Sequence, residues 1–284
     1  MSIGPRASTR TQADGLEAYR RRLYDSYFSS HYALIRTPGR LSRGEKAHFD
    51  HHFKRHLPAD HSARILDVGC GHGSLLLYLR GRGYHNVAGI DWSAEAVKLG
   101  RTSNLDVVEA SAEDYLRRRV AELDVVFAVD VIEHVMRSEL LGLLDAVYGA
   151  LKPGGKFVLQ VPNADGPFSG RLRYGDLTHE QSFTADSIGQ ALRVCGFTEI
   201  EVWPVKPAVH GAASALRWFL WQAIRTFLAA YLAAETGVIR GHVLSQNLIA
   251  TAVRPRPSDR PVTGFSWSCR AASSSTDWHE PTHH

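Results

Sequence analysis

Cysteine is scarce in this chain of 284 residues, and the scarcity excludes two classes of small protein. The three cysteines, Cys70, Cys195 and Cys269, lie far apart in the sequence. This spacing provides neither a disulfide framework nor the paired ligands of a zinc site. A reducing cytoplasm is therefore the predicted setting.

Excess charge and long uncharged apolar runs are lacking as well. The 33 basic and 29 acidic residues leave a formal charge of +4, which is too small to demand nucleic acid or an anionic membrane as a partner. The N-terminus is polar and Arg-rich without an apolar core, so no secretory signal is predicted. Residues 211–235 are strongly apolar, but Arg217 and Arg225 interrupt them before the ~20 residues that a spanning helix needs.

One stretch has the features of a nucleoside-binding unit. Residues 63–68 are apolar and β-branched, as in a buried strand, and lead into Gly69-Cys70-Gly71-His72-Gly73. Glycines at alternate positions let the backbone approach a ligand closely. A helix capped by Ser74 should follow, and then a second strand that ends at Asp91, where a carboxylate can bind a ribose diol.

The glycine spacing separates two cofactors. The pattern GxGxxG places a dinucleotide pyrophosphate at a helix N-terminus, but here the third glycine is one residue early and Ser74 stands in the last position. The segment 66–71, Leu-Asp-Val-Gly-Cys-Gly, resembles the first motif of class I S-adenosylmethionine (SAM) methyltransferases. The turn Leu-Lys-Pro-Gly-Gly at 151–155 resembles the same family, and the resemblance covers roughly residues 43–254. It implies that the cofactor is SAM.

The resemblance also implies roles for single residues. Asp67 would reach the amino-acid end of SAM, Asp91 its ribose, and the loop at 111–114 its adenine, although Ser111 stands where an acid is usual. The residues expected to bind SAM are Asp67, Gly69, Cys70, Gly71, Gly73, Asp91, Trp92, Ser111, Ala112, Glu113 and Asp130.

Alternating strand and helix patterns predict an α/β fold. We expect a Rossmann-like, doubly wound, mostly parallel seven-stranded sheet with an antiparallel edge strand and helices on both faces. Its parts are a disordered N-terminus (1–15), a helical cap (16–60), the SAM-binding core (61–203), an apolar helical insertion (204–245), a last strand (246–253) and a disordered tail (254–284).

For two helical segments outside the core, the sequence allows more than one role. The cap would cover the cofactor, by the same resemblance, and its second helix, predicted at 43–57, places His48, His52 and His56 on one face. We expect that face to be solvated or partly packed rather than a metal site. The apolar helix at 211–235 would pack on the protein or form a homodimer contact, or else lie peripherally on the inner face of a membrane.

Two clusters at the carboxyl edge of the sheet could activate a methyl acceptor. Asp130, Glu133 and His134 follow the fourth strand, and His179 and Glu180 lie beyond the fifth. This pattern resembles the Mg²⁺ site of small-RNA 2′-O-methyltransferases and ubiquinone-pathway O-methyltransferases, whose first acid is Glu rather than Asp. We predict metal-free catalysis with His179 as general base and Glu180 and His134 as further catalytic candidates. The alternative is a metal held by Asp130, Glu133, His134 and His179.

The acceptor is predicted from resemblance alone. The stretch 177–184, Leu-Thr-His-Glu-Gln-Ser-Phe-Thr, and the apolar insertion look similar to bacterial methyltransferases of glycan and lipid-linked saccharide biosynthesis. O-methylation of a sugar or a lipid-linked saccharide is therefore predicted, with a quinone-like small molecule or RNA as alternative acceptors. The Arg runs at 117–119 and 171–173 are too short for a nucleic-acid surface, so nucleic acid is not expected as a partner. A non-catalytic SAM-binding subunit is the remaining alternative.

Overall fold

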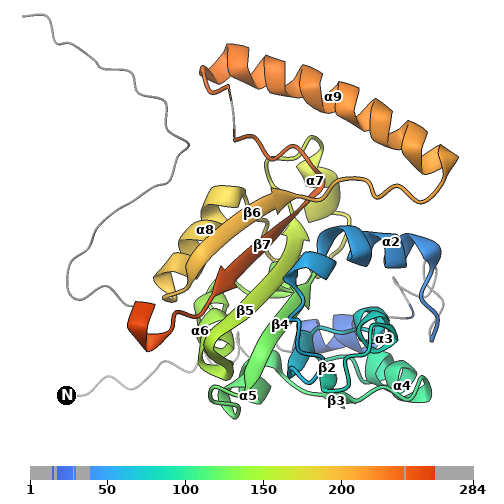
Figure 1. Cartoon of the computed structure of the whole chain (residues 1–284), viewed down its shortest axis with the longest axis vertical. Helices are drawn as coiled ribbons and strands as arrows, with labels where there is room; N and C mark the ends of the chain where they lie inside the picture. The colour runs from blue at the N-terminus through green and yellow to red at the C-terminus, as the bar shows by residue number, and fades with distance from the viewer. Residues whose placement is uncertain (1–14, 16–17, 28, 30–38, 240, 260–284) are drawn as a thin grey trace, which may run out of the picture.

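The computed structural model describes residues 15, 18–27, 29, 39–239 and 241–259 (Figure 1). The predicted disorder at 1–14 and 260–284 lies outside the described residues. Arg254, assigned to the tail from the sequence, is part of the folded domain, because its guanidinium donates hydrogen bonds to the carbonyls of Tyr148, Gly149 and Leu151.

A seven-stranded sheet in the order β3-β2-β1-β4-β5-β7-β6 forms the centre of the molecule. β1 to β5 are parallel, and β7 runs antiparallel between β5 and the outermost strand β6. The strands are β1 (Ile65–Val68), β2 (Val87–Asp91), β3 (Val107–Glu109), β4 (Leu123–Val129), β5 (Leu151–Pro162), β6 (Thr198–Pro204) and β7 (Asn247–Val253). The predicted Rossmann-like fold is confirmed.

Helices cover both faces of this sheet, as the right-handed crossovers between parallel strands require. One apolar core lies under α2 (Arg43–His52), α3 (Ser74–Gly81) and α4 (Ala94–Thr102). The other lies under α5 (Ala112–Arg117), α6 (Leu140–Ala150) and α8 (Ala185–Val194). Because both faces are covered, β1 is buried along its whole length, which explains why all of its residues except Asp67 are apolar.

Two local predictions were wrong in detail. Ser74 is the first residue of α3 rather than its cap; the cap position belongs to Gly73, whose φ of 90° is the left-handed conformation that glycine adopts without strain. The Lys-Pro-Gly-Gly segment lies within β5, at a register shift against β4, instead of forming a separate turn before it. Other boundaries agree closely, and α8 begins at the predicted Thr184 cap.

The histidine face of the N-terminal cap is packed. Residues 18–25 are helical, and α2 follows with a capping box made by Ser42 and Glu45 before a short 3-10 turn, η2 (Lys54–His56), replaces the rest of the predicted helix. His52 and His56 are buried, and burial lowers the pKa of each to about 4. A solvated face is therefore excluded for these two, which serve as neutral core residues.

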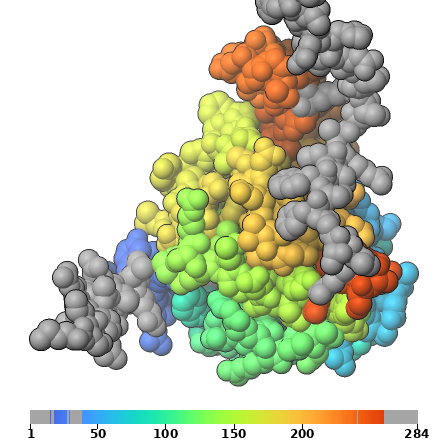
Figure 2. All heavy atoms as spheres, turned by 90° about the vertical axis from the view of Figure 1, so that its left-hand side faces the viewer, coloured from blue at the N-terminus to red at the C-terminus, as the bar shows by residue number. Residues whose placement is uncertain are grey.

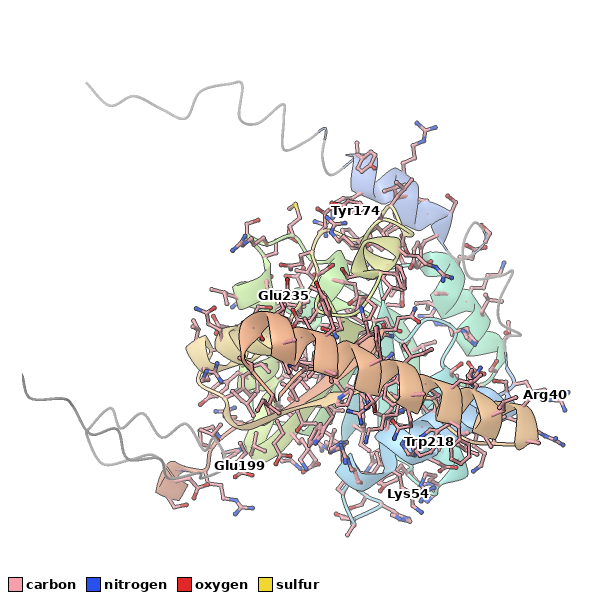
Figure 3. All side chains as sticks on the ribbon, turned by 90° about the horizontal axis from the view of Figure 1, so that it is seen from above. Arg40, Lys54, Tyr174, Glu199, Trp218 and Glu235 are labelled. Carbon is pink, nitrogen blue, oxygen red and sulfur yellow. The ribbon has the colours of Figure 1, made fainter. Side chains whose placement is uncertain are left out.

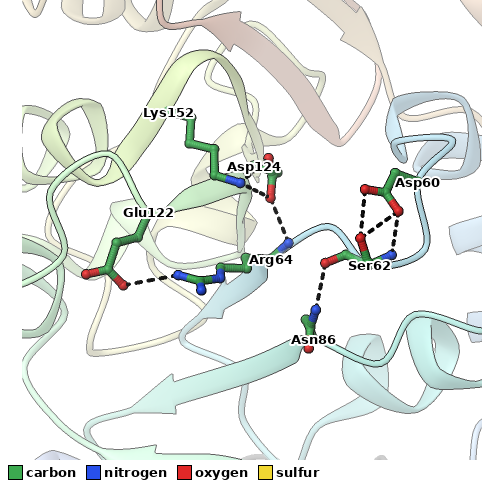
Figure 4. A network of polar contacts seen from close by, with 7 residues as sticks. All are labelled: Asp60, Ser62, Arg64, Asn86, Glu122, Asp124 and Lys152. Carbon is green, nitrogen blue, oxygen red and sulfur yellow. Dashed lines mark hydrogen bonds and ion pairs between the residues drawn. The ribbon is translucent and has the colours of Figure 1, made fainter.

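The amino ends of the strands are tied together by polar contacts (Figure 4). The Asp124 carboxylate accepts hydrogen bonds from the Arg64 backbone N–H at 2.8 Å and from Lys152 Nζ at 2.7 Å. Asn86 Nδ2 donates to the carbonyl of Ser62 at 2.6 Å. These contacts join β1, β4 and β5 at their amino ends. The carboxyl ends of the strands remain available for a ligand.

The apolar insertion forms one long helix, α9 (Ala212–Thr236), which lies across the carboxyl end of the sheet beyond the short helix α7 (Ser169–Arg173) (Figure 1). A space-filling view shows it projecting from the body of the protein (Figure 2). Within the described residues, every helix is too short or too polar to cross a membrane.

Candidate active site

A cavity of about 480 Å³ opens at the carboxyl ends of β1, β2 and β4. Its size suits a small organic ligand. The glycine loop after β1, Asp91 at the end of β2 and the segment 129–135 after β4 all contribute to its wall. This is the position at which doubly wound sheets bind nucleotides, because the loops after neighbouring parallel strands diverge there.

The glycine loop lines the cavity, and Gly69 at its start has no room for a side chain. A Cβ at Gly69 would lie 2.5 Å from Val131 Cγ2, and the residue has a φ of 65°. Gly69, Cys70 and Gly71 line the cavity, and their binding of SAM stays a prediction. Gly73 does not; a Cβ there would clash with Leu105, so that glycine is required by packing and by the start of α3.

Asp91 is oriented by the loop that it faces. Its carboxylate accepts hydrogen bonds from the backbone N–H groups of Gly71 and Ser93, both at 2.8 Å. Burial raises the pKa of Asp91 although these bonds act in the opposite direction. Asp67 is fully buried beside it, and desolvation together with the charge of Asp91 raises the Asp67 pKa further. A ligand with hydroxyl and ammonium groups would satisfy both acids, which is what a SAM ribose and amino-acid tail offer.

Of the predicted adenine loop at 111–114, one residue lines the cavity. Ala112 lines the cavity together with Ala110, and Trp92 lies on the same side. Ser111 and Glu113 do not line it; Glu113 is half-buried and pairs with Arg117 Nη2 at 2.6 Å along α5. Neither acid nor hydroxyl from this loop reaches the cavity in this structure.

An aromatic cover from the N-terminal cap closes one side of the cavity. Tyr24 stacks on Trp92 with ring centroids 5.4 Å apart, and the Arg20 guanidinium lies 5.3 Å from the same indole. Arg20 also pairs with Glu139 at 3.1 Å. Arg20 and Tyr24 were not predicted as site residues. Both belong to the cap that was expected to cover the cofactor, but no motif in the sequence singles them out.

His134 lies in the cavity wall and is held by a short chain of hydrogen bonds. Asp176 Oδ1 accepts from the Thr178 hydroxyl at 2.6 Å, and Asp176 Oδ2 accepts from Tyr27 Oη at 2.7 Å. Thr178 Oγ1 lies 2.8 Å from His134 Nδ1. Burial raises the pKa of Asp176, but the hydrogen bonds from Thr178 and Tyr27 outweigh it and keep that pKa below its ordinary value.

This chain fixes the tautomer of His134. Because Asp176 is ionised, it can only accept, so the Thr178 hydroxyl donates its proton to Asp176. Thr178 Oγ1 must then accept from His134 Nδ1–H. In the neutral ring the lone pair is therefore on Nε2, and the Asp176 charge stabilises the imidazolium that forms when Nε2 takes a proton.

His179 and Glu180, the other two predicted catalytic residues, lie behind this wall. His179 Nδ1 is 2.9 Å from the Leu172 carbonyl oxygen and must donate to it, and the imidazole meets the His134 ring edge-on at 4.7 Å. The Glu180 backbone N–H donates to the Glu133 carbonyl at 2.8 Å. Among the described residues neither side chain lines the cavity. The role of His179 as a base stays a prediction.

Glu133, His134 and His179 form a group whose ligand atoms lie within 4.8 Å of one another. Glu133 is inaccessible to solvent, and its two carboxylate oxygens accept no hydrogen bond from the described residues. Burial and the nearby Asp130 raise the Glu133 pKa well above its ordinary value. Asp130 is not in the group, because Gln160 Nε2 holds its carboxylate at 3.0 Å. The donor set fits a divalent transition metal better than Mg²⁺, which prefers oxygen ligands.

Replacing Glu133 by glutamine should raise the melting temperature at about pH 8 and change it little at about pH 5. The folded-state pKa lies above the ordinary value of 4.5, so ionisation opposes folding increasingly as the pH rises above that value. Glutamine keeps the shape and cannot ionise. One kcal/mol corresponds to roughly 2–4 °C at this chain length, and thermal denaturation at the two pH values measures the change. A lower melting temperature at both, reproduced in wild type by a chelator, would instead show an ionised carboxylate on a bound metal.

Comparison with known proteins agrees with this geometry. Over 204 residues the chain is 29% identical to a tRNA U34 carboxymethyltransferase of Trichlorobacter lovleyi, a match that spans 68% of this chain and 62% of that protein. A ubiquinone biosynthesis O-methyltransferase of Xylella fastidiosa is 35% identical over 107 residues, 36% of this chain and 42% of that enzyme. The chain thus matches less than two-thirds of the length of either relative.

Solved structures share the fold. A SAM-dependent methyltransferase from Archaeoglobus fulgidus superposes with a TM-score of 0.56 at 21% identity, over 75% of this chain and 94% of that one. A phosphoethanolamine N-methyltransferase of Haemonchus contortus in complex with SAM gives a TM-score of 0.52 at 23% identity, over 72% of this chain and 51% of that one.

The family model described as a methyltransferase domain matches residues 41–202, which is more than half of the chain. This range holds the glycine loop, Asp91 and His134, the residues that build the cavity. The cofactor implied by the resemblance, SAM, is confirmed. The chain belongs to the methyltransferase domain family.

Proposed function

We propose that this methyltransferase O-methylates a phenol-like hydroxyl on a small, quinone-related acceptor. The observation that supports it is the His134–Thr178–Asp176 chain, which turns Nδ1 of an imidazole in the cavity wall toward Thr178 and leaves Nε2 as the nitrogen that can take a proton. A phenol, with a pKa of about 10, is within reach of such a base, whereas an alcohol is far less acidic. The names of the ubiquinone biosynthesis relatives support the same acceptor class.

When bound, SAM supplies an electrophilic methyl group on a sulfonium. The residues of this chain hold it and prepare the acceptor: Asp91 and Asp67 bind its polar ends, and the glycine loop lets it approach the backbone. Tyr24 and Trp92 shield the site from water on the cap side. His134 removes the acceptor proton through Nε2, and Asp176 stabilises the resulting positive charge through Thr178.

Acceptor screening by mass shift tests the proposal. The protein is incubated with SAM and, in parallel, with catechol-type phenols, with saccharides and lipid-linked saccharides, and with tRNA. A gain of one methyl group on the phenols, together with S-adenosylhomocysteine release, is the expected result. Methylation of the saccharides alone would establish the acceptor predicted from the sequence, and methylation of tRNA alone would overturn both. SAM binding without turnover on any acceptor would favour a non-catalytic subunit.

Metal dependence can be measured in the same assay. We expect a chelator followed by dialysis to leave turnover unchanged, because the proton transfer described above needs only side chains. The control is SAM binding, which should be the same before and after treatment. Loss of turnover that Mn²⁺ or Zn²⁺ restores would show that Glu133, His134 and His179 bind a catalytic metal.

A further inference from the structure

Helix α9 is apolar on both sides: Trp218, Trp221 and Leu228 are half-buried on the side that meets the protein, and a second set of large apolar side chains faces solvent. At about 100° per residue the large outward side chains fall on one side of the helix. Six of them are each more than half exposed: Leu216, Phe219, Leu220, Ile224, Phe227 and Tyr231. Ser214, Gln222 and Arg225, on the opposite side, are buried or half-buried. A helix that is apolar on all sides is normally buried on all sides, whereas this one is covered by the described domain on one side only.

The outward face is long and unobstructed by the rest of the described domain. α9 has 25 residues, so it is roughly 37 Å long. Seen from above, it spans the end of the molecule, with Trp218 and Glu235 near its two ends (Figure 3). An exposed apolar strip of this length is typical of an interaction surface.

We propose that this face binds the same face of a second copy of the chain, with the two α9 helices antiparallel about a two-fold axis. The charges on the helix are self-complementary in that arrangement. Arg217 and Glu235 are both exposed and are separated by five turns of helix, so they lie on the same flank of the apolar face. A two-fold axis centred near Thr226 keeps that flank on one side of the pair and places Arg217 opposite Glu235 of the second copy.

The same register fits the side chains of the apolar face. It places Ala234 of the second copy level with the gap between Leu216 and Leu220, and Ala230 of the second copy within one residue of the level of Ala223. Phe227 of the second copy lies within one residue of the level of Ile224. Small residues thus meet large ones at the ends, and alanines meet in between, which allows two helices to approach closely. About 21 residues of each helix overlap, or roughly 31 Å.

A second copy suits this face better than a membrane surface does. The exposed charges on α9 are of both signs, and an anionic bilayer would attract Arg217 but repel Glu235. In the antiparallel pair each of these charges has a partner of opposite sign. Isologous contacts of this kind, in which residue i meets residue j on both sides, are the commonest basis of homodimers.

Sedimentation of the full chain tests the proposal. The wild-type protein should sediment as a dimer of 31.5 kDa chains. Arg217→Glu and Glu235→Arg should each weaken association at least tenfold, because each turns two symmetry-related attractions into two repulsions. Mixing the two variants in equal amounts should restore a dimer, since opposite charges again meet at both ends of the mixed pair. Lys98→Glu on the exposed side of α4 is the matched control and should leave the dimer intact.

The outcomes separate the possible occupants of the face. A monomeric wild type at high concentration overturns the proposal, and flotation of that monomer with phosphatidylglycerol vesicles would assign the face to a membrane instead. A dimer that both charge variants leave unchanged would also overturn the antiparallel register. SAM affinity serves as the folding control, because among the described residues those that line the cavity lie outside α9.

Discussion

Replacing Asp91 by alanine should weaken SAM binding by about 2–4 kcal/mol, or roughly 30- to 1,000-fold in dissociation constant. The carboxylate lies at the end of β2 in the cavity wall, where a ribose diol can donate two hydrogen bonds to it. Such bonds to a buried charge are stronger than those between neutral groups. Isothermal titration with SAM measures the loss.

Two variants control this experiment. The carboxylate also accepts from the N–H groups of Gly71 and Ser93, so part of the loss could come from a loosened glycine loop. Asp91→Asn keeps a side-chain oxygen for one of these bonds and should bind SAM with intermediate affinity. Glu109, which pairs with Asp91 in the register of β3, is exposed and outside the cavity, so Glu109→Ala should bind normally. Wild-type affinity in Asp91→Ala would remove this residue from the cofactor site.

Replacing His134 by alanine should lower turnover of the acceptor by about 10²–10⁴-fold while SAM affinity changes little. The reason is the loss of the group that accepts the acceptor's proton. His179→Ala is the matched comparison, because its ring packs against His134 but is turned to the Leu172 carbonyl. A larger loss in His179→Ala than in His134→Ala would assign the base to His179, as predicted from the sequence.

Thr178→Val tests the positioning of that imidazole. Valine keeps the branched shape but can neither accept from His134 Nδ1 nor donate to Asp176, and we expect turnover to fall roughly 10- to 100-fold. Without the link to the Asp176 charge, the imidazolium is less stable, so the acid limb of the pH–rate profile should move to lower pH. Thr178→Ser should restore both rate and profile. A uniformly slower enzyme with an unchanged profile would mean that Thr178 has only a structural role.

Some of the predicted site residues line the cavity and others do not, and their positions in the chain explain the difference. Gly69, Gly71 and Asp91 could be found from sequence because each occupies a fixed place in a strand–loop–helix–strand unit, and the parallel sheet brings those places together. Ser111 and Glu113 sit in a loop whose path no local rule fixes, and the Glu113 side chain turns to Arg117 instead of the cavity. Arg20, Tyr24 and Thr178 contact residues that are distant in the sequence. Their sequence neighbours therefore do not indicate what they contact.

The sequence by itself determined the order of the strands and helices, the cofactor loop and the acid at the end of β2, because periodicity and glycine spacing are local properties of the chain. Only the tertiary structure decided that His134 rather than His179 lines the cavity, that His52 and His56 are core residues, and that α9 faces outward. Those outcomes depend on which surfaces are removed from water when distant segments pack, and burial is a property of the folded chain as a whole.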